Sequence, residues 1–290
     1  MGIYLCIDIG GTAIKYGLYN EDGQKVASFA SDQTNNAILQ QNISNTLRKK
    51  IRELKYLDLA GVCISSAGVV DPVAGKIIYS GYTIPNYTGT AIKEMIETEF
   101  QLPCEVENDV NAACLGEYWQ GALRGTTSGV CLTVGTGVGG PILIDGQIFH
   151  GAGYTAGEIG YMDINGARFQ DVASTSALIK RVRLRKGESL DGKEIFQQAK
   201  AGDSVCIEEI EVLIENLSMG IINIIYLLNP ERLVLGGAIM AQETYLKPRI
   251  QKILDQKIQD NQFKQTELHI AQLKNDAGMV GALYNFIKRQ

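Results

Sequence analysis

The pattern of apolar and polar positions repeats once along the chain. In each copy an apolar run typical of a buried strand leads through a glycine-rich turn into a second apolar run, which ends in a tight turn. Both tight turns read Asp-Gly-Gln, so we interpret the copies as a duplicated β-hairpin unit and expect two related lobes facing one cleft. The first copy covers 3–24, with its glycine turn at 10–12; the second covers 129–147, with its turn at 135–137.

The remaining periodicity predicts an α/β fold built from two units of β-β-β-α-β-α-β order. The N-terminal lobe, 1–110, is expected to hold a hairpin (3–29), helices at 36–53 and 89–100, and strands at 59–65 and 104–107. The larger C-terminal lobe, 111–277, is expected to hold strands at 129–134, 232–235 and 267–271, and helices at 172–186, 193–200, 205–228 and 244–259. A last helix within 278–290 is expected to pack back on the first lobe.

Composition and charge narrow the class of protein. The chain has 290 residues, of which 45% are hydrophobic and 20% charged, enough for two globular domains. No uninterrupted apolar stretch reaches the roughly 18 residues of a membrane-spanning helix, and no signal peptide is evident, so we expect a cytoplasmic protein. Six cysteines at wide spacing predict reduced thiols in the core.

The net charge of −5 also bears on the choice of partner, because no run of Lys and Arg forms a stripe that could follow a phosphate backbone. The densest basic segment, Arg181–Lys186, is typical of a solvated helix face. We therefore expect neither nucleic acid nor a membrane as partner.

The second glycine turn formally fits the dinucleotide-binding pattern G-x-G-x-x-G at Gly135–Gly140. That pattern needs a helix directly after the turn, but the segment from Pro141 reaches a new turn at Gly146. The Rossmann interpretation fails, and the Walker pattern is absent as well.

A glycine-rich hairpin turn can still bind phosphate, because residues without Cβ let backbone N–H groups approach an anion. An isolated turn of this kind is more often an ordinary β-turn, but two at equivalent places in duplicated units favour phosphate binding. Asp8, directly before the first turn, could hold Mg²⁺ near a triphosphate or cap the turn. The candidate residues are Gly10, Gly11, Thr12 and Lys15 in the first turn and Gly135, Thr136 and Gly137 in the second.

Two further segments carry candidate polar groups. Asn108 and Asp109 stand between a short strand and an Ala-rich helix start, where either could cap the helix. A carboxylate at that junction could instead deprotonate a substrate hydroxyl. Glu158 lies in a loop bracketed by glycines, either as a solvated side chain or as an acceptor for vicinal sugar hydroxyls.

Taken together, these segments resemble the ROK family of sugar kinases, within the actin-like and hexokinase-like ATPase superfamily. The resemblance covers nearly the whole chain. It rests on Asp8–Thr12 with Lys15, Ser65–Asp71, Pro85-Asn86, Glu107–Asn111, Gly135–Gly140, Ala156–Gly160 and Leu235–Ile239.

The resemblance implies a two-lobed ATP-dependent kinase and, by family habit, a homodimer. Asp109 would be the base that takes the proton from a sugar hydroxyl, usually at carbon 6, as that oxygen attacks the γ-phosphate of ATP. The glycine turns and Thr133 would hold the phosphates, Asp8 the Mg²⁺ ion, and Gly236, Gly237 and Ala238 would lie by the adenosine. Gly68, Asn86, Asn108, Asp109 and Glu158 would hold the sugar.

The chain departs from the family pattern in the segment after Glu158. Many members have a histidine where this chain has Tyr161, followed by a cysteine cluster that binds zinc; residues 163–170 contain no cysteine, so we expect no structural zinc. The second sugar-contacting glutamate has no clear counterpart either. The pattern is closest to the zinc-free β-glucoside kinase branch, in which Tyr161 could stack beside a sugar and admit a β-linked disaccharide or a modified hexose.

Two other functions compete with the kinase hypothesis. A ROK repressor would carry a helix-turn-helix before the first glycine turn, but only seven residues precede Asp8. A catalytically weak sugar-binding ROK protein with a regulatory role is disfavoured by Asp109 and by the presence of both phosphate turns.

Overall fold

The computed structural model describes residues 2–34, 41–81 and 84–290, which form two compact units. Unit 1 comprises Met1–Arg124, Gly151–Thr155 and Asn275–Gln290; unit 2 comprises Gly125–His150 and Ala156–Lys274. The division after Arg124 lies later than the expected one after residue 110, because the helix that begins at Asp109 packs within unit 1.

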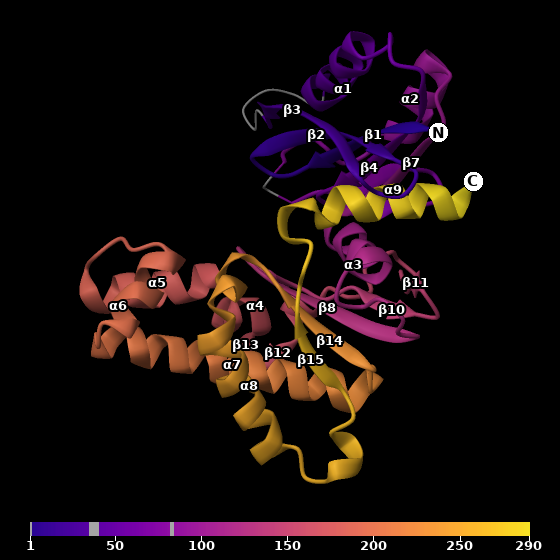
Figure 1. The fold of residues 1–290 in the computed structure, drawn as a ribbon. Helices are drawn as coiled ribbons and strands as arrows, with labels where there is room; N and C mark the ends of the chain where they lie inside the picture. The colour runs from indigo at the N-terminus through magenta and orange to yellow at the C-terminus, as the bar shows by residue number, and fades with distance from the viewer. Residues whose placement is uncertain (1, 35–40, 82–83) are drawn as a thin grey trace. The chain divides into compact units, whose positions relative to one another are not determined.

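Unit 1 is built on a five-stranded sheet in the order β3-β2-β1-β4-β7 (Figure 1). β1, β4 and β7 are parallel; β2 pairs antiparallel with β1, and β3 pairs antiparallel with β2. The strands are β1 Ile3–Ile9, β2 Ala13–Asn20, β3 Lys25–Gln33, β4 Leu59–Ser66 and β7 Cys104–Asn108, with a separate hairpin of β5 Val69–Asp71 and β6 Lys76–Tyr79. The helices are α1 Gln41–Glu53, α2 Ile92–Phe100, α3 Asp109–Gln120 and α9 Ala277–Arg289; residues 36–40 of the predicted first helix lie outside the described residues.

The two faces of this sheet have different chemistry. One face is aliphatic, with Leu5, Ile7, Ile64 and Val106 packed in one core with residues of α1 and α2. The opposite face carries smaller and more polar side chains and is covered by α9, which lies across the sheet from α1 and α2 in Figure 1. This second face therefore has room for buried polar groups.

Helix α9 packs on α3 with almost no side chain between the two backbones. A Cβ built on Gly281 would lie 1.6 Å from the carbonyl oxygen of Ala112, and one on Gly116 would lie 2.4 Å from that of Ala277. Only glycine fits at either position. The C-terminal helix is thus part of unit 1 and holds α3 in place.

Unit 2 repeats the topology of unit 1 in a sheet of order β11-β10-β8-β14-β15, with β9 paired to β8. Both units place the strand before the glycine turn in the middle of the sheet, which bears out the duplication inferred from the sequence. The strands are β8 Ser128–Val134, β9 Val138–Gly139, β10 Ile142–Ile144, β11 Gln147–Ile148, β14 Arg232–Gly236 and β15 Glu267–Ile270, with a hairpin of β12 Asp163–Ile164 and β13 Ala167–Arg168. The helices are α4 Phe169–Ala173, α5 Thr175–Lys186, α6 Gly192–Lys200, α7 Ser204–Leu228 and α8 Glu243–Lys257, and short 3₁₀ helices are η1 Ile159–Tyr161, η2 Ala238–Gln242, η3 Asn261–Phe263 and η4 Lys274–Asp276.

The local sequence explains most of these boundaries. Asp145 and Gly146 both have positive φ, as the tight turn between β10 and β11 requires. Asn229 ends α7 in the left-handed conformation, directly before Pro230. The predicted helix 172–186 is wrong in one respect: Ser174 breaks it, because its hydroxyl caps α5 by accepting the Ala177 N–H.

Helix α7 is the core helix of unit 2. It is long and apolar enough to cross a membrane by length and composition, and no other helix in the described ranges passes that test. More than half of its apolar window is buried inside the structure, and the core helix of a globular protein passes the same test. All six cysteines are buried as well, and none forms a disulfide.

Candidate active site

The candidate residues fall into one group in each unit. In unit 1 the parallel strands β1, β4 and β7 end at the same edge of the sheet, which brings the residues after them together. Unit 1 holds Asp8, Gly10, Gly11, Thr12, Lys15, Gly68, Asn86, Asn108 and Asp109; unit 2 holds Thr133, Gly135, Thr136, Gly137, Glu158, Tyr161, Gly236, Gly237 and Ala238.

Asp8 is held on both of its carboxylate oxygens. In the sheet register it stands opposite Lys15 on β2 and Ser65 on β4. Lys15 Nζ lies 3.2 Å from Asp8 Oδ2, and Ser65 Oγ donates to Asp8 Oδ1 at 2.9 Å. Because the Asp8 side chain is only 19% exposed while that of Lys15 is 49% exposed, the pair presents a cation at the mouth of the turn and an oriented carboxylate beneath it.

The first glycine turn is closed by one backbone hydrogen bond and one side-chain hydrogen bond. The Gly10 N–H donates to the Ala13 carbonyl at 3.0 Å, and Thr34 Oγ1 donates to the Gly10 carbonyl at 2.7 Å. Thr12 is exposed at the tip. A short turn without bulky side chains, next to a lysine, fits an anion such as a phosphate.

The structure shows which of Asn108 and Asp109 caps the helix at the junction of β7 and α3. Asn108 is the N-cap: its Oδ1 accepts the N–H groups of Val110 and Asn111 at 3.1 Å. Asp109 is the first helical residue, and its Oδ1 accepts Asn108 Nδ2 at 3.1 Å and the Val110 N–H at 2.9 Å. Asp109 is partly exposed, so its carboxylate is oriented at a helix N-terminus without being sealed in the core.

The loop before α2 approaches the same edge of the sheet. Asn86 is exposed and has a φ of 59°, and the next residue, Tyr87, is buried with its hydroxyl 2.9 Å from Ser66 Oγ. Burial raises the pKa of Tyr87; the hydrogen bond to Ser66 opposes this rise, and the negative charge of Asp109 adds to it. Asp109 is therefore close enough to the Tyr87 hydroxyl for its charge to be felt there.

Gly68 joins this group through its backbone. Its carbonyl accepts Asn108 Nδ2 at 2.8 Å, which ties the loop after β4 to the cap of α3. Its φ of +98°, and the 2.8 Å that would separate a Cβ from the Tyr79 carbonyl, explain why glycine occupies the position.

In unit 2 the second glycine turn connects β8 to β9 and is anchored by α5. The Gly135 N–H donates to the Gly137 carbonyl at 3.0 Å, and the Gly135 carbonyl accepts the Thr175 N–H at 2.9 Å. A Cβ on Gly135 would meet no atom within 4 Å. Open space beside this backbone, with Thr136 exposed at the tip, suits the approach of a phosphate.

Gly236 is the last residue of β14, Gly237 and Ala238 follow it, and this segment lies beside the end of β8 that leads into the same turn. Gly236 stands opposite Thr133 in the register. Gly237 has a φ of +108°, and a Cβ there would lie 2.1 Å from the Val134 carbonyl. The structure therefore brings together the phosphate and adenosine candidates of unit 2.

The loop that carries Glu158 packs on β9 through its two glycines. A Cβ on Gly157 would lie 2.7 Å from the Gly140 carbonyl, and one on Gly160 would lie 2.4 Å from the Val138 carbonyl. Although Glu158 is exposed by surface area, partial loss of solvation raises its pKa. Tyr161, at the end of η1, is 61% exposed.

The donor set bears on the expected metals. In the part of the chain that the structure describes, no group of three or more His, Cys, Asp and Glu side chains could hold a metal ion. A single carboxylate such as Asp8 still fits Mg²⁺, which proteins commonly bind through one or two carboxylates together with substrate phosphates. Where zinc-binding relatives would have cysteines, β12 and β13 form a hairpin in which Asp163 Oδ1 accepts the Gly166 N–H at 2.9 Å.

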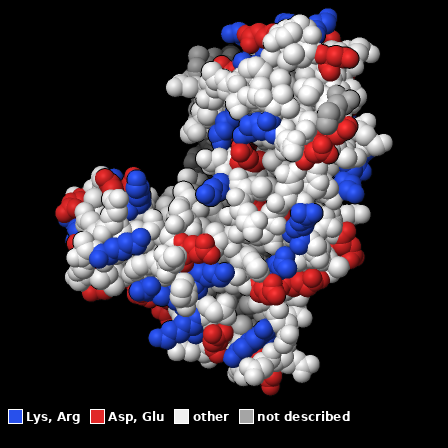
Figure 2. All heavy atoms as spheres, viewed as in Figure 1, with Lys and Arg blue, Asp and Glu red and all other residues white. Residues whose placement is uncertain are grey.

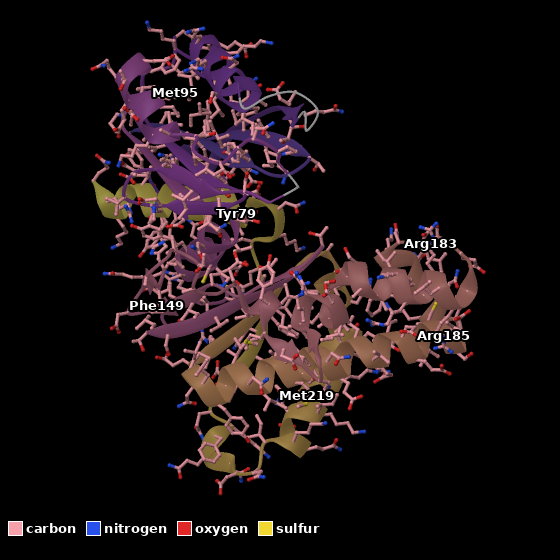
Figure 3. All side chains as sticks on the ribbon, turned by 180° about the vertical axis from the view of Figure 1, so that it is seen from behind. Tyr79, Met95, Phe149, Arg183, Arg185 and Met219 are labelled. Atoms are coloured by element: carbon pink, nitrogen blue, oxygen red, sulfur yellow. The ribbon has the colours of Figure 1, made fainter. Side chains whose placement is uncertain are left out.

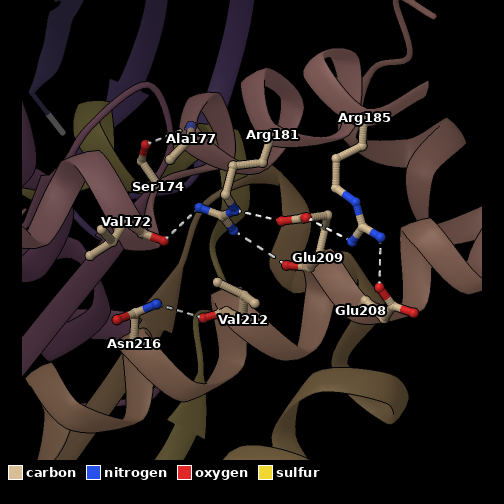
Figure 4. Close-up of polar contacts among 9 residues, drawn as sticks. All are labelled: Val172, Ser174, Ala177, Arg181, Arg185, Glu208, Glu209, Val212 and Asn216. Atoms are coloured by element: carbon tan, nitrogen blue, oxygen red, sulfur yellow. Dashed lines mark hydrogen bonds and ion pairs between the residues drawn. The ribbon is translucent and has the colours of Figure 1, made fainter. Parts of the chain in front are cut away.

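Two arginines of the basic segment on α5 form ion pairs with acidic side chains of α7 (Figure 4). Glu209, buried on α7, accepts Arg181 Nε at 2.7 Å and Arg185 Nη1 at 3.0 Å. Figure 3 shows Arg185 on the side of α5 that faces α7 and Arg183 on the other side. The expectation of a solvated helix face is therefore incomplete, because two of its arginines pair with acidic side chains.

Charges of both signs are interspersed on the face of the molecule that Figure 2 shows. Acidic and basic side chains alternate there over short distances, so opposite charges offset one another locally. This face offers no extended basic stripe.

Comparison with known proteins assigns the family. The ROK family model matches residues 4–289, so the chain belongs to the ROK family. A β-glucoside kinase of Klebsiella pneumoniae is 32% identical, over 96% of this chain and 94% of that protein. Solved structures of a ROK family protein from Streptococcus pneumoniae TIGR4 in complex with sucrose (29% identity, TM-score 0.87, 99% and 98% coverage) and of a ROK family glucokinase from Streptomyces griseus in complex with glucose and AMPPNP (26%, 0.82, 98% and 98%) are similar to it.

The predicted fold class is thereby confirmed as that of the hexokinase-like ROK proteins. Sequence reasoning gave no role to the groups that hold the candidates in place: Ser65, Ser66, Tyr87 and Thr175. The first two lie in the segment Ser65–Asp71 that carried the resemblance, and two consecutive serines at the end of an otherwise apolar buried strand are a signal that could have singled them out. The tyrosine and threonine gave no such signal.

Replacing Gly135 with alanine should weaken ATP binding without weakening the fold, because the new Cβ meets no protein atom but occupies the space beside the turn. We expect the KM for ATP to rise at least about tenfold, with the melting temperature nearly unchanged. Gly237→Ala is the contrasting variant, since its Cβ would collide with Val134 and should lower the melting temperature. An unchanged KM in Gly135→Ala would contradict phosphate binding at this turn.

Glu158→Gln should make the protein slightly more stable at neutral pH. The raised pKa means that the charged form of Glu158 is disfavoured in the folded state, so the wild type loses stability as pH rises above the unfolded-state pKa, and glutamine removes that loss. The gain in melting temperature should be present at pH 7 and vanish near pH 4, where both states hold the proton. Glu188→Gln, at an exposed position after α5, is the control; a gain that persists at pH 4 would refute the charge explanation.

Proposed function

We propose that this protein is an ATP-dependent sugar kinase and that Asp109 is its general base. The observation that carries the proposal is the Asp109 carboxylate, partly exposed and oriented by Asn108 and the first turn of α3, at the sheet edge that also presents the Asp8 turn. ROK membership and the similarity to a glucokinase bound to glucose and AMPPNP support it.

In this mechanism Asp109 accepts the proton of a sugar hydroxyl while that oxygen forms a bond to the γ-phosphorus of ATP. The bond from this phosphorus to the β,γ-bridging oxygen breaks, and ADP leaves. Hydrogen bonds from Asn108 Nδ2 and the Val110 N–H aim the carboxylate. Oriented proton transfer of this kind contributes about 10²–10⁴ in rate.

The proposed nucleotide contacts are assigned within each unit by itself. The proposal gives Gly10, Gly11, Thr12 and Lys15 of unit 1 and Thr133, Gly135, Thr136 and Gly137 of unit 2 to the phosphates, and Gly236, Gly237 and Ala238 to the adenosine. Mg²⁺, with Asp8 as its protein ligand, would neutralise developing charge on the phosphates. Such catalysis depends mainly on positioning, which the anchored turns provide.

The sugar would be held by Gly68, Asn86, Asn108, Asp109 and Glu158, with Tyr161 beside it. We propose the 6-hydroxyl of a hexose or of a β-glucoside as the acceptor. The β-glucoside kinase relative and the sucrose complex of a second relative support a pocket that accepts a disaccharide, and Tyr161 is exposed enough to stack on a sugar ring. A cytoplasmic location, a homodimer and the absence of structural zinc stay predictions.

Asp109→Asn should lower kcat by about 10²–10⁴ while changing sugar affinity only a few-fold, because asparagine keeps the shape but cannot take the proton. ADP release measures turnover, and sugar-induced shifts in melting temperature measure binding. Asp58→Asn, in an exposed loop, is the matched control. A variant that retained a tenth or more of wild-type kcat would rule Asp109 out as the base.

A panel of glucose, cellobiose, other β-glucosides and N-acetylmannosamine should identify β-glucosides as the better substrates by kcat/KM. Tyr161→Ala should then lower kcat/KM for cellobiose more than for glucose, since it removes the stacking surface for the second ring. Turnover of glucose far above that of every β-glucoside would overturn the substrate assignment while leaving the kinase assignment intact.

A further inference from the structure

Strand β4 ends in two consecutive serines, Ser65 and Ser66, whose side chains have no measurable exposure. Neighbouring residues of a strand point to opposite faces of the sheet. Ser65 stands opposite Asp8 and Glu107 in the register, and Ser66 stands opposite Ile9 and Asn108. The two hydroxyls therefore serve different sides of unit 1.

On one face, the Ser65 hydroxyl fixes the orientation of Asp8. It donates to Asp8 Oδ1 at 2.9 Å, while Lys15 holds Oδ2. A Cβ on Gly278 of α9 would lie 3.1 Å from Ser65 Oγ and 3.4 Å from Asp8 Oδ1, so a glycine leaves space for the pair. A carboxylate that binds a metal together with phosphates works best when a second group fixes its orientation.

On the other face, the Ser66 hydroxyl anchors the loop that carries Asn86. It lies 2.9 Å from the hydroxyl of Tyr87, which is 1% exposed, and Thr90 Oγ1 donates to the Tyr87 carbonyl at 2.7 Å. Asn86 itself has a φ of 59°, in the left-handed region that few residues other than glycine and asparagine adopt. Tyr87 is thus the buried anchor beside an exposed residue with a defined, uncommon backbone conformation.

We propose that Ser65 and Ser66 are positioning residues with separate tasks, Ser65 for MgATP through Asp8 and Ser66 for the sugar through Tyr87 and Asn86. This inference rests on the proposed kinase function. Neither serine touches a substrate. The end of β4 thereby orients two sets of residues in unit 1, those proposed for MgATP on one face of the sheet and those proposed for the sugar on the other.

A general structural role makes a different prediction from a positioning role. If the serines had only a general structural role, loss of either hydroxyl would weaken the whole edge of the sheet and shift the affinities for MgATP and sugar together. Two separate tasks predict that each affinity responds to only one of the two serines. This distinction concerns the two affinities and not the rate of turnover.

The test measures KM for ATP, the Mg²⁺ concentration at half-maximal rate and KM for the sugar in Ser65→Ala, Ser66→Ala and Tyr87→Phe. Ser65→Ala should raise the first two about five- to tenfold and leave the sugar KM unchanged, a change on the scale of one hydrogen bond. Ser66→Ala and Tyr87→Phe should each raise the sugar KM by a similar factor and leave the ATP constants unchanged. The double variant Ser66→Ala/Tyr87→Phe should be no worse than Ser66→Ala alone, which already lacks both the bond to Tyr87 and the 3.1 Å bond from Ser66 Oγ to the Ala67 carbonyl.

Ser218→Ala is the matched control, since Ser218 is a fully buried serine of α7 in unit 2 whose hydroxyl donates to the Ile214 carbonyl. It should change neither constant. Should Ser65→Ala fail to fold, Ser65→Cys, with a weak donor of similar shape, replaces it. The proposal is overturned if ATP and sugar constants move together in either serine variant, or if neither constant moves.

Calorimetric titration with Mg²⁺-AMPPNP and with cellobiose gives the same comparison as dissociation constants. If the wild type phosphorylates no sugar of the panel, the kinase function fails, whereas the two serines are still judged by these binding constants. If the wild type binds neither ligand, both proposals fall.

Discussion

The parallel pairing of β1, β4 and β7 is the constraint on which the candidate site of unit 1 depends. Parallel strands in register end at one edge, so Asp8, Ser66 and Asn108 are brought together although nearly a hundred residues separate the first from the last. A shift of β4 by one residue would exchange the faces of its two serines and separate each hydroxyl from its partner. The aliphatic face fixes this register, because Ile7, Ile64 and Val106 must stay buried against α1 and α2.

The same topology occurs in unit 2, where the polar residues at the strand ends are replaced mainly by glycines. Gly236 and Gly237 lie against the backbone at the end of β8, and the loop around Glu158 packs on the backbone of β9 and Gly140. Unit 1 thus offers oriented side chains, whereas unit 2 offers backbone that an anion or a flat ring can approach. The proposed division of labour between base, metal ligand and nucleotide cradle follows from this difference in composition.

The sequence predicted the fold well because its signals were local. Apolar runs, glycine turns and the Asn229-Pro230 helix end each depend on a few neighbouring residues, and the duplication supplied the pairing of elements. It predicted less well where distant residues decide: the unit boundary depends on α9 packing against α3, and Ser174 divided a helix that periodicity alone would continue. In the site, the motifs named the exposed groups, but Ser65 and Tyr87 hold them through contacts that only the folded chain creates.

The backbone-to-backbone packing of α9 on α3 has a consequence for how the protein is made. The helix that carries Asp109 leaves the ribosome long before its partner, and all of unit 2 is translated between them. A nascent chain can therefore complete unit 2 while the sheet of unit 1 still lacks its covering helix on one face. The segment around Asp109 would gain this packing only once α9 has been made, so a chain that stopped before α9 would leave α3 without its partner helix.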